Sequence, residues 1–559
     1  MKKKLLIFVS LFLVAQLGFS GGIVTNTNQS TAWTRMLTRD ASTSIDAVYF
    51  NPAGLMKLND GFHFSINNQS LWQTQTITNT YPYLNEGKYE GKVTAPLFPG
   101  VYAAWKKGRV AVSFGFNPIG GGGGATFDKG LPSMEIGVSS LVPAMQGAFG
   151  QLGYGTPTGY SLDMNFEGSS VYFGLQLGVS FEINDNISVF AGGRYIIAKN
   201  TYNGYMRNIK IQTEGGAYGD DLPAASTMGD ISTTFSNISA AAQGGGDAMQ
   251  PILDNGGGDY TFAQLEEAGY ITSEERAQME GGLLQFGIPQ EQIDAMSAAQ
   301  AQGTYYQTSQ VMAGRSASFA GLSVILTDQD ADVTQTGNGF TPIIGANLSF
   351  MEDRLNIGLK YEFKTNMDLT TSVADNKGFI NDIDPNTGQP LYMFNEGEKV
   401  NADIPAMLSV GVQYKIIDPL SIQLGYHTYF DKAAGWATDE GGTELIDKNF
   451  SEYAIGLEYN ITDKFLVSAG YLAAITGVNK KYQSDLSYSL STNTFGGGFA
   501  YKINDKFTAQ IGAFSTSYKD QTVDYTHSFD SSTGVQTVPY SNTYDKKTFA
   551  FSLGIDVSL

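Results

Sequence analysis

Few side chains in this sequence are spaced for catalysis. The chain contains no Cys, so a thiolate nucleophile, a disulfide framework and a thiolate metal site are all excluded. Its three histidines, His63, His427 and His527, are far apart in sequence and lack metal-ligand spacing such as H-E-x-x-H. No G-x-S-x-G nucleophile elbow occurs. We therefore expect no enzyme, no metal and no cofactor, with a membrane lipase that assembles a Ser–His pair in space as the alternative.

Two cations have positions suited to binding an anion. Arg194 and Lys360 fall on the polar phase of segments that alternate apolar and polar residues. If the apolar phase faces lipid, both cations face the interior, where they could meet a ligand carboxylate in a charge-assisted contact. The alternative is that they pair with interior acids such as Glu182, Glu362 or Glu458.

Four large apolar residues share this inward phase. Phe190, Ile196, Leu466 and Leu472 interrupt a face that otherwise carries Gly, Ser, Gln and charged residues. We expect them to help form an apolar ligand pocket. The expectation depends on register, because a shift of one residue would turn all four outward.

The elements that position these side chains are predicted to be strands. The last residues place Phe549, Phe551, Leu553 and Ile555 on one face and small or polar residues on the other. Residues 170–183 repeat the pattern. Applied to the whole chain, it predicts fourteen strands: 61–72, 100–107, 109–117, 170–183, 187–212, 339–351, 353–367, 402–416, 420–430, 451–461, 464–475, 492–503, 507–519 and 545–559.

The connections between these strands alternate between short and long. The short ones carry turn residues at 107–108, 184–186, 352–353, 418–419, 462–463 and 504–505. This alternation predicts an all-β fold, namely a transmembrane antiparallel up-and-down β-barrel of about 14 strands. Closure follows because hydrocarbon offers no partner to an unpaired strand edge. A soluble multi-sheet sandwich is the alternative. The long connections are 73–99, 118–169, 213–338, 368–401, 431–450, 476–491 and 520–544.

The start of the chain indicates secretion, and its net charge argues against nucleic-acid binding. Residues 1–20 combine three lysines, an apolar run from Leu5 to Leu17 and a small-residue end, which is typical of a signal peptide. The 34 basic and 54 acidic residues give a formal net charge of −20, which argues against nucleic-acid binding. We expect a protein of the cell outer membrane with both termini in the periplasm.

Residues 21–60 precede the first strand and lack its period. They are too aromatic for a flexible periplasmic tail, which is the alternative, and fourteen strands enclose more space than side chains alone fill. We therefore predict an N-terminal hatch over 21–60, plugging a barrel over 61–559. Asn51, Pro52 and Ala53 are the predicted hatch or gating element, because Pro fixes its φ and Asn bonds nearby backbone. The alternative is an ordinary turn that leads into the first strand.

Two long connections have features of their own. Five glycines at 120–124 predict a mobile loop, and the apolar residues that follow, at 131–145, either form an exposed capture patch or close the barrel mouth. Within the insertion at about 213–338, we expect a helix that starts at Thr261 or an adjacent residue and ends near Gly269, a capping box at Thr272, and a helix near Pro289. Acids such as Asp254 and Asp259 match no EF-hand loop, so we expect them to be solvated.

Three short stretches resemble the FadL/TodX family of outer-membrane transport proteins. Asp46–Leu55 (DAVYFNPAGL) is similar to the family's Asn-Pro-Ala element near the mature N-terminus, and Thr38–Thr43 and Ile404–Gly411 are similar to further parts of it. The resemblance implies uptake of hydrophobic small molecules, most specifically long-chain fatty acids or aromatic hydrocarbons. It further implies capture by outer loops, passage to a pocket in the barrel, and lateral release beside a kinked strand, gated by the hatch.

The expected partners follow from this resemblance. They are a hydrophobic small-molecule ligand, outer-membrane lipid and lipopolysaccharide, and the barrel-assembly machinery, with the protein itself a monomer. Two other functions stay open: a general porin for polar solutes, and a surface barrel for adhesion or docking through its large loops. A porin would conduct ions steadily, whereas an adhesin would bind a macromolecule through 213–338.

Overall fold

The computed structural model describes residues 22–384, 386–439, 441–531 and 534–559. The predicted signal peptide, residues 1–20, lies outside the described residues. Among these residues, no helix is long and apolar enough to cross a membrane.

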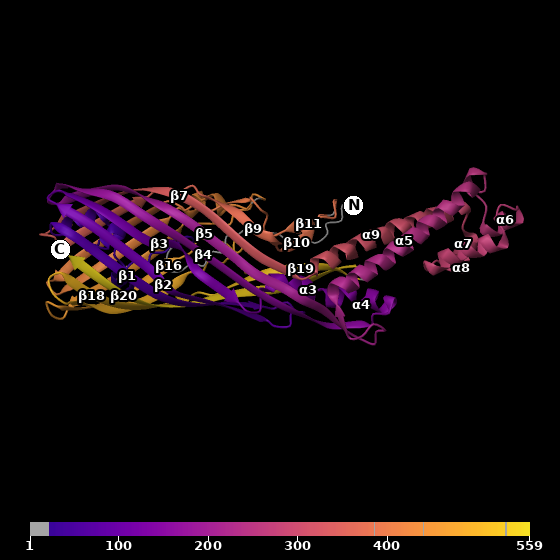
Figure 1. The fold of residues 1–559 in the computed structure, drawn as a ribbon, viewed down its shortest axis with the longest axis horizontal. Helices are drawn as coiled ribbons and strands as arrows, with labels where there is room; N and C mark the ends of the chain where they lie inside the picture. Colours follow the sequence, from indigo (N-terminus) through magenta and orange to yellow (C-terminus); the bar gives the residue numbers. More distant parts are fainter. Residues whose placement is uncertain (1–21, 385, 440, 532–533) are drawn as a thin grey trace.

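Antiparallel strands close into a barrel (Figure 1). The ring closes because β1 pairs with β2 on one side and with β20 on the other, for example through Ile66 opposite Ile555. All fourteen predicted strands are present, which confirms the fold class. In barrel order they are β1 (Gly61–Asn79), β2 (Lys88–Lys107), β3 (Val110–Phe127), β4 (Thr156–Asn184), β5 (Ile187–Glu214), β7 (Gln329–Phe350), β8 (Leu355–Glu362), β13 (Met407–Ile417), β14 (Leu420–Tyr429), β15 (Phe450–Asn460), β16 (Phe465–Ile475), β17 (Thr492–Lys502), β18 (Phe507–Tyr518) and β20 (Gly534–Ser558).

The two ends of the barrel differ as the connection lengths predict. Tight turns join strands at one end, called here the short-turn end, where the C-terminus also lies (Figure 1). The opposite, long-connection end carries further short elements. They are β6 (Asp221–Pro223), β9 (Asp368–Gly378), β10 (Ile380–Ile383), β11 (Pro390–Tyr392), β12 (Lys399–Asn401), β19 (Gln521–Ser531) and the 3-10 turns η2 (Asp431–Ala433) and η3 (Gly435–Ala437).

One predicted loop is wrong. The glycines at 120–124 are not a mobile connection, because they belong to β3, where Gly120, Gly121, Gly123 and Gly124 pair with β4. Glycine has low strand propensity, so the sequence pattern stops at 117, whereas pairing with β4 holds the segment extended.

The outer face of the barrel is apolar, in the predicted phase. On β20, Phe549 and Leu553 are 48% and 52% exposed, whereas Ala550 and Ser552 between them are fully buried. The same alternation on β4 exposes Leu177 and buries Gln176. A closed wall with an apolar outside and small or polar residues inside is the construction of a membrane-spanning barrel.

Two short helices, α3 (Pro132–Ser139) and α4 (Leu141–Leu152), lie at the long-connection end. Leu131, Ile136, Leu141 and Met145 are buried there, so this segment packs inward rather than forming an exposed patch.

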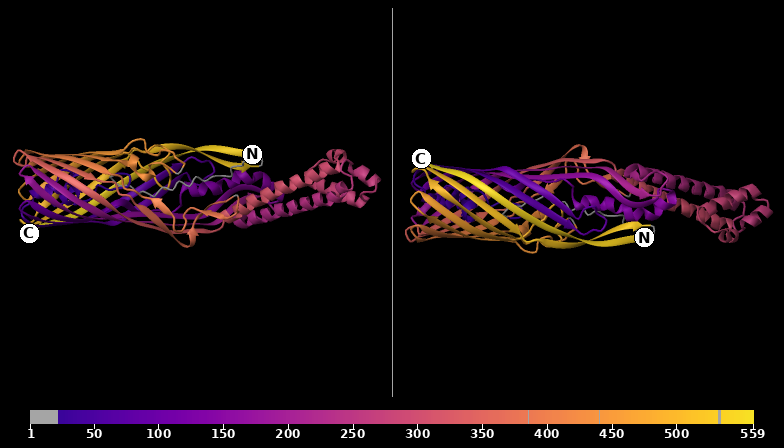
Figure 2. Two further views of the ribbon diagram at one scale, coloured as in Figure 1. Left: turned by 90° about the horizontal axis from the view of Figure 1, so that it is seen from above. Right: turned by 90° about the horizontal axis from the view of Figure 1, so that it is seen from below.

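A helical arm projects from the same end along the barrel's long axis (Figure 2). Its shaft is the antiparallel pair α5 (Ala224–Asp254) and α9 (Ala298–Ile325), and its tip holds α6 (Phe262–Glu267), α7 (Ser273–Gln285) and α8 (Gln290–Ala295). The tip helices confirm the expected starts, with capping boxes at Thr261 and Thr272. The shaft is held together by small residues, since Ser232 contacts Ser316 and Ser239 contacts Ser309.

The N-terminal residues fold inside the barrel, toward the short-turn end. The hatch segment, residues 22–58, contains α1 (Thr31–Met36), α2 (Ala47–Phe50) and η1 (Pro52–Lys57), and its side chains are almost all buried. The backbone of the hatch segment packs against the wall at inward-facing glycines. A Cβ added there would meet hatch atoms at Gly358, Gly411, Gly425, Gly456, Gly470, Gly496 and Gly512, on successive strands from β8 to β18.

We expect Gly470→Ala to loosen the hatch, because its Cβ would collide with the backbone of Met36. Overpacking of this kind costs about 1–3 kcal/mol. Steady ion conductance in planar bilayers should rise, and the thermal unfolding midpoint should fall. Gly497→Ala is the matched control, because a Cβ there makes only an ordinary contact, with Ser468. Equal behaviour of the two variants would contradict the tight hatch contact.

Candidate functional site

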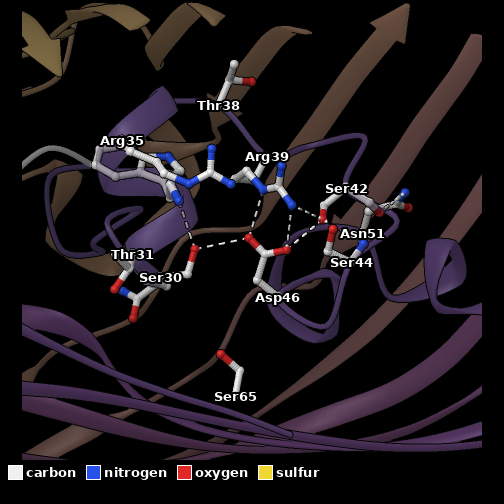
Figure 3. Close-up of polar contacts among 12 residues, drawn as sticks. Ser30, Thr31, Arg35, Thr38, Arg39, Ser42, Ser44, Asp46, Asn51 and Ser65 are labelled. Carbon is white, nitrogen blue, oxygen red and sulfur yellow. Dashed lines mark hydrogen bonds and ion pairs between the residues drawn. The ribbon is translucent and has the colours of Figure 1, made fainter. Parts of the chain in front are cut away.

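A buried ion pair organises the hatch segment (Figure 3). The Arg39 guanidinium donates to both carboxylate oxygens of Asp46, from Nε at 2.8 Å and from Nη2 at 2.9 Å. Ser42 and Ser30 donate their hydroxyls to the same carboxylate, at 2.6 and 3.0 Å. Burial alone would raise the pKa of Asp46, but Arg39 and the hydroxyls outweigh it and hold that pKa below its ordinary value. The bidentate pair fixes the fold of the segment that precedes Asn51.

The predicted Asn51-Pro52-Ala53 element is a docking point on the wall. Asn51 Nδ2 donates to Asn347 Oδ1 on β7, at 2.8 Å. Ser180 on β4 and Ser188 on β5 donate their hydroxyls to the carbonyls of Pro52 and Ala53, each at 2.7 Å. The element is therefore more than an ordinary turn before β1, although its gating role stays a prediction.

A second charged contact joins the hatch to β13 and β14. His427 on β14 lies between two carboxylates, with Nε2 2.6 Å from Asp40 and Nδ1 2.8 Å from Glu452. Ser409 on β13 also donates to Asp40, at 3.0 Å. The sequence analysis treated His427 only as an isolated histidine. Its inward position on a strand could have indicated a buried role, but its partners lie far away in sequence, in the hatch and on β15.

Arg194 and Lys360 lie together against the hatch. Arg194 forms a bidentate pair with Glu362, at 2.6 and 3.0 Å, and Lys360 Nζ lies 2.8 Å from the same carboxylate. Both cations also lie over the ring of Tyr49, at 4.9 and 4.6 Å from its centroid. Of the three interior acids named as alternative partners, Glu362 is thus the one they contact, and the role of the two cations toward a ligand remains a prediction.

The four predicted pocket residues do not form one group. Phe190 packs with Ala53 and Ile343 beside the hatch. Ile196 and Leu472 are buried in the main apolar cluster of the interior, whereas Leu466 is only half-buried. The inward phase is confirmed for the buried three, but the strands separate them around the barrel.

The main apolar cluster runs along the barrel interior. It includes Trp33 and Phe50 of the hatch, Ile119 on β3, and Tyr488 and Tyr544 toward the long-connection end. A second cluster continues it beneath α3, α4 and the base of the arm. Apolar side chains therefore extend from the long-connection end down to the hatch, and buried polar residues such as Gln75 and Asn200 lie among them.

The wall itself is interrupted between β2 and β3. The ladder runs from Gly91 to Val93, paired with 125–127, and resumes at Val101, opposite Phe116. Among the described residues, no ladder pair joins 94–100 to 117–124, although each segment stays paired with its other neighbour, β1 or β4. Pro118 lacks an N–H, and Gly121 has a φ of +76°, so β3 kinks here and shifts its register with β4. We call this place the wall gap.

The start of the hatch segment bonds to β3 at the wall gap. Asn26 donates from its backbone N to the Ile119 carbonyl at 2.8 Å and from Nδ2 to the Gly121 carbonyl at 2.6 Å. Gln29 donates Nε2 to the Pro118 carbonyl at 3.0 Å. Backbone carbonyls that β2 leaves unpaired are therefore satisfied by the hatch. The hatch and the wall gap are one structural unit.

The wall gap lies at the height of the apolar belt. The β1 residues opposite 94–100 of β2, from Asn67 to Trp72, are paired on their other side with 549–554 of β20. Phe549, Phe551 and Leu553 are the exposed apolar residues of that stretch. Leu97 beside the gap is 76% exposed. An interruption at this height faces hydrocarbon rather than water.

Asp46→Asn should destabilise the protein, because it leaves the buried Arg39 without its counter-charge. Removal of one partner from a buried ion pair costs about 3–5 kcal/mol, measurable as the free energy of unfolding by urea in detergent micelles. Because folding lowers the Asp46 pKa, the pair stabilises above the carboxyl's ordinary pKa and is lost as pH falls through the lower folded value.

The matched control for Asp46→Asn is Asp60→Asn. Asp60 also pairs with a cation, Lys106, but its side chain is 58% exposed, so little change is expected. If both variants unfolded like the wild type, the ion pair would not organise the hatch.

Comparison with known proteins supports the fold. No protein-family model and no curated protein sequence matches the chain. Among solved structures, a Pseudomonas aeruginosa FadL homologue aligns with a TM-score of 0.53 at 14% identity, covering 96% of this chain and 100% of that one. The P. putida toluene transporter TodX aligns with a TM-score of 0.45 at 11% identity, covering 92% of this chain and 94% of that one. The chain therefore has the same barrel fold as the P. aeruginosa FadL homologue.

Proposed function

We propose that this protein is an outer-membrane channel for uptake of hydrophobic small molecules, of the FadL/TodX type, with long-chain fatty acids as its cargo. The long-connection end and its arm face the outside, and the short-turn end, with the C-terminus, faces the periplasm. The expected periplasmic N-terminus is not proposed, because Ile23 packs inside the barrel against Met407 and Tyr429. The observation that carries the proposal is the wall gap, which lies at the height of the apolar belt and is bonded to the hatch.

Physical chemistry explains why a hydrophobic cargo suits this construction. Transfer of a hydrophobic molecule from an apolar interior into water is unfavourable, since burial of apolar surface is favourable by about 25 cal/mol per Å². An exit through the side of the barrel would let it pass from one apolar medium to another. The apolar clusters supply the route from the mouth, and the wall gap supplies the exit.

The hatch would control this route. Its bonds to Pro118, Ile119 and Gly121 lie on one side, and the Asn51-Pro52-Ala53 docking point lies on the other. A shift of the segment as a unit would expose the gap. The plugged interior disfavours a general porin, and adhesion through the helical arm stays the alternative role for that insertion.

We expect the detergent-purified barrel to bind a fluorescent long-chain fatty acid saturably and to show little conductance in a planar bilayer. Pro52→Gly should raise conductance, because it frees a fixed φ within the docking point. Competition with toluene tests the cargo class, since preferential displacement by toluene would favour an aromatic hydrocarbon. Steady wild-type conductance without binding would make the protein a porin.

The exit route has its own test. Gly120→Trp places a bulky side chain where β3 meets the carbonyl of Val24, inside the wall gap. Uptake of a radiolabelled fatty acid by intact cells should fall to near that of cells lacking the protein, while binding to the purified barrel persists. Gly303→Trp, in open space on α9, is the control. Uptake unaffected by Gly120→Trp would rule out release through this gap.

A further inference from the structure

One buried cation in the barrel lacks the partner that the others have. Lys546 lies on the inward face of β20 and is 3% exposed. Its ammonium donates to the Tyr488 carbonyl at 2.9 Å and lies 4.1 Å from the centroid of the Tyr488 ring. Within the described residues, no carboxylate forms an ion pair with it. A carbonyl and a ring face offset its charge only in part.

In the part of the chain that the structure describes, each of the other buried lysine and arginine side chains has a carboxylate partner, which Lys546 lacks. Arg35 pairs with Glu458, Arg39 with Asp46, and Arg194 and Lys360 share Glu362. Burial of an ammonium without a counter-ion is unfavourable, so a folded protein seldom retains one without a use for it. An ammonium has three donors, and the protein uses one of those on Lys546.

Lys546 lies in the barrel interior between the long-connection end and the hatch. On the same inward face of β20, Tyr544 lies on the side of the long-connection end. Toward the short-turn end follow Thr548, Ala550 and Ser552, and Ser552 contacts Thr31 of the hatch. Asp545 and Lys547, the outward neighbours of Lys546, are polar, so Lys546 lies just beyond the apolar belt. Tyr488 and Tyr544 of the main apolar cluster lie near it, Gln75 on β1 is paired opposite it, and Phe514 lies closer to the hatch, opposite Ala550.

We propose that Lys546 binds the acidic head group of an amphipathic cargo, a long-chain carboxylate whose tail lies along the main apolar cluster. The proposal rests on the proposed function and assigns the contact with the cargo's head group to one residue. Two free N–H donors suit the oxygens of a carboxylate, and a charge-assisted bond in a buried site is strong. Arg194 and Lys360 are less suited, because Glu362 already neutralises them. Toluene and other hydrocarbons would gain nothing from Lys546.

The first test needs no variant. The detergent-purified wild-type barrel is titrated with a long-chain fatty acid and with the primary alcohol of the same chain length, by displacement of a fluorescent fatty acid. Loss of one charge-assisted bond corresponds to about a 10- to 100-fold weaker affinity, so the acid should bind more tightly by that factor. Equal affinities for acid and alcohol would overturn the proposal.

Substitution then assigns this preference to the residue. Lys546→Met should lose most of the affinity for the acid and keep that for the alcohol, and Lys546→Arg should restore the preference. Lys547→Met is the matched control, because the adjacent lysine is exposed on the other face. Retained heat-modifiable migration of each variant would show that the barrel is folded. If Lys546→Met does not fold, Lys546→Arg and the wild-type acid preference decide.

The outcomes separate the two proposals. Wild-type binding of neither acid nor alcohol would overturn the uptake function and this inference with it. Equal binding of both by the wild type and by Lys546→Met would leave uptake of hydrophobic molecules intact and remove only the role of Lys546.

Discussion

Every backbone N–H and C=O in the wall of this barrel needs a partner, and the rest of the structure depends on that requirement. Hydrocarbon supplies none, so the strands pair all the way around, from β1 to β20 and back to β1. Between β2 and β3 the ladder is interrupted. There the hatch supplies hydrogen-bond donors, because Asn26 and Gln29 donate to the carbonyls of β3. The same requirement that closes the wall thus ties the hatch to the interruption between β2 and β3.

The interior charges form a second level of organisation. Asp46 holds Arg39 within the hatch, and the hatch meets the wall through Asp40 with His427 and through Tyr49 with Lys360. These contacts are buried, so each ionised group has a carboxylate or cation close to it. Such pairs contribute geometry more than net stability. They hold a short segment of small helices in a single position inside the barrel.

The helical arm follows different rules. Its shaft is built from helices rich in Ala, Ser and Gly, and close approach of the two backbones lets Ser232 contact Ser316 and Ser239 contact Ser309. Because small residues bury little apolar surface, such a pair lacks the strong apolar stripe that marks most amphipathic helices. The tip helices were predictable from their capping boxes, since those are local contacts at Thr261 and Thr272. The shaft was not.

The sequence by itself determined the barrel, its strand count, the facing of its strands and the presence of an N-terminal hatch. These depend on a period of two residues and on connection lengths, both of which are local properties of the chain. It also showed that Arg194 and Lys360 face inward, and it named Glu362 among their alternative partners. Only the tertiary structure decided that His427 meets Asp40, that the glycines at 120–124 kink a strand, and that Lys546 has no acid beside it. Each of these depends on which distant segments lie side by side, and closure of the ring and insertion of the hatch fix that at long range.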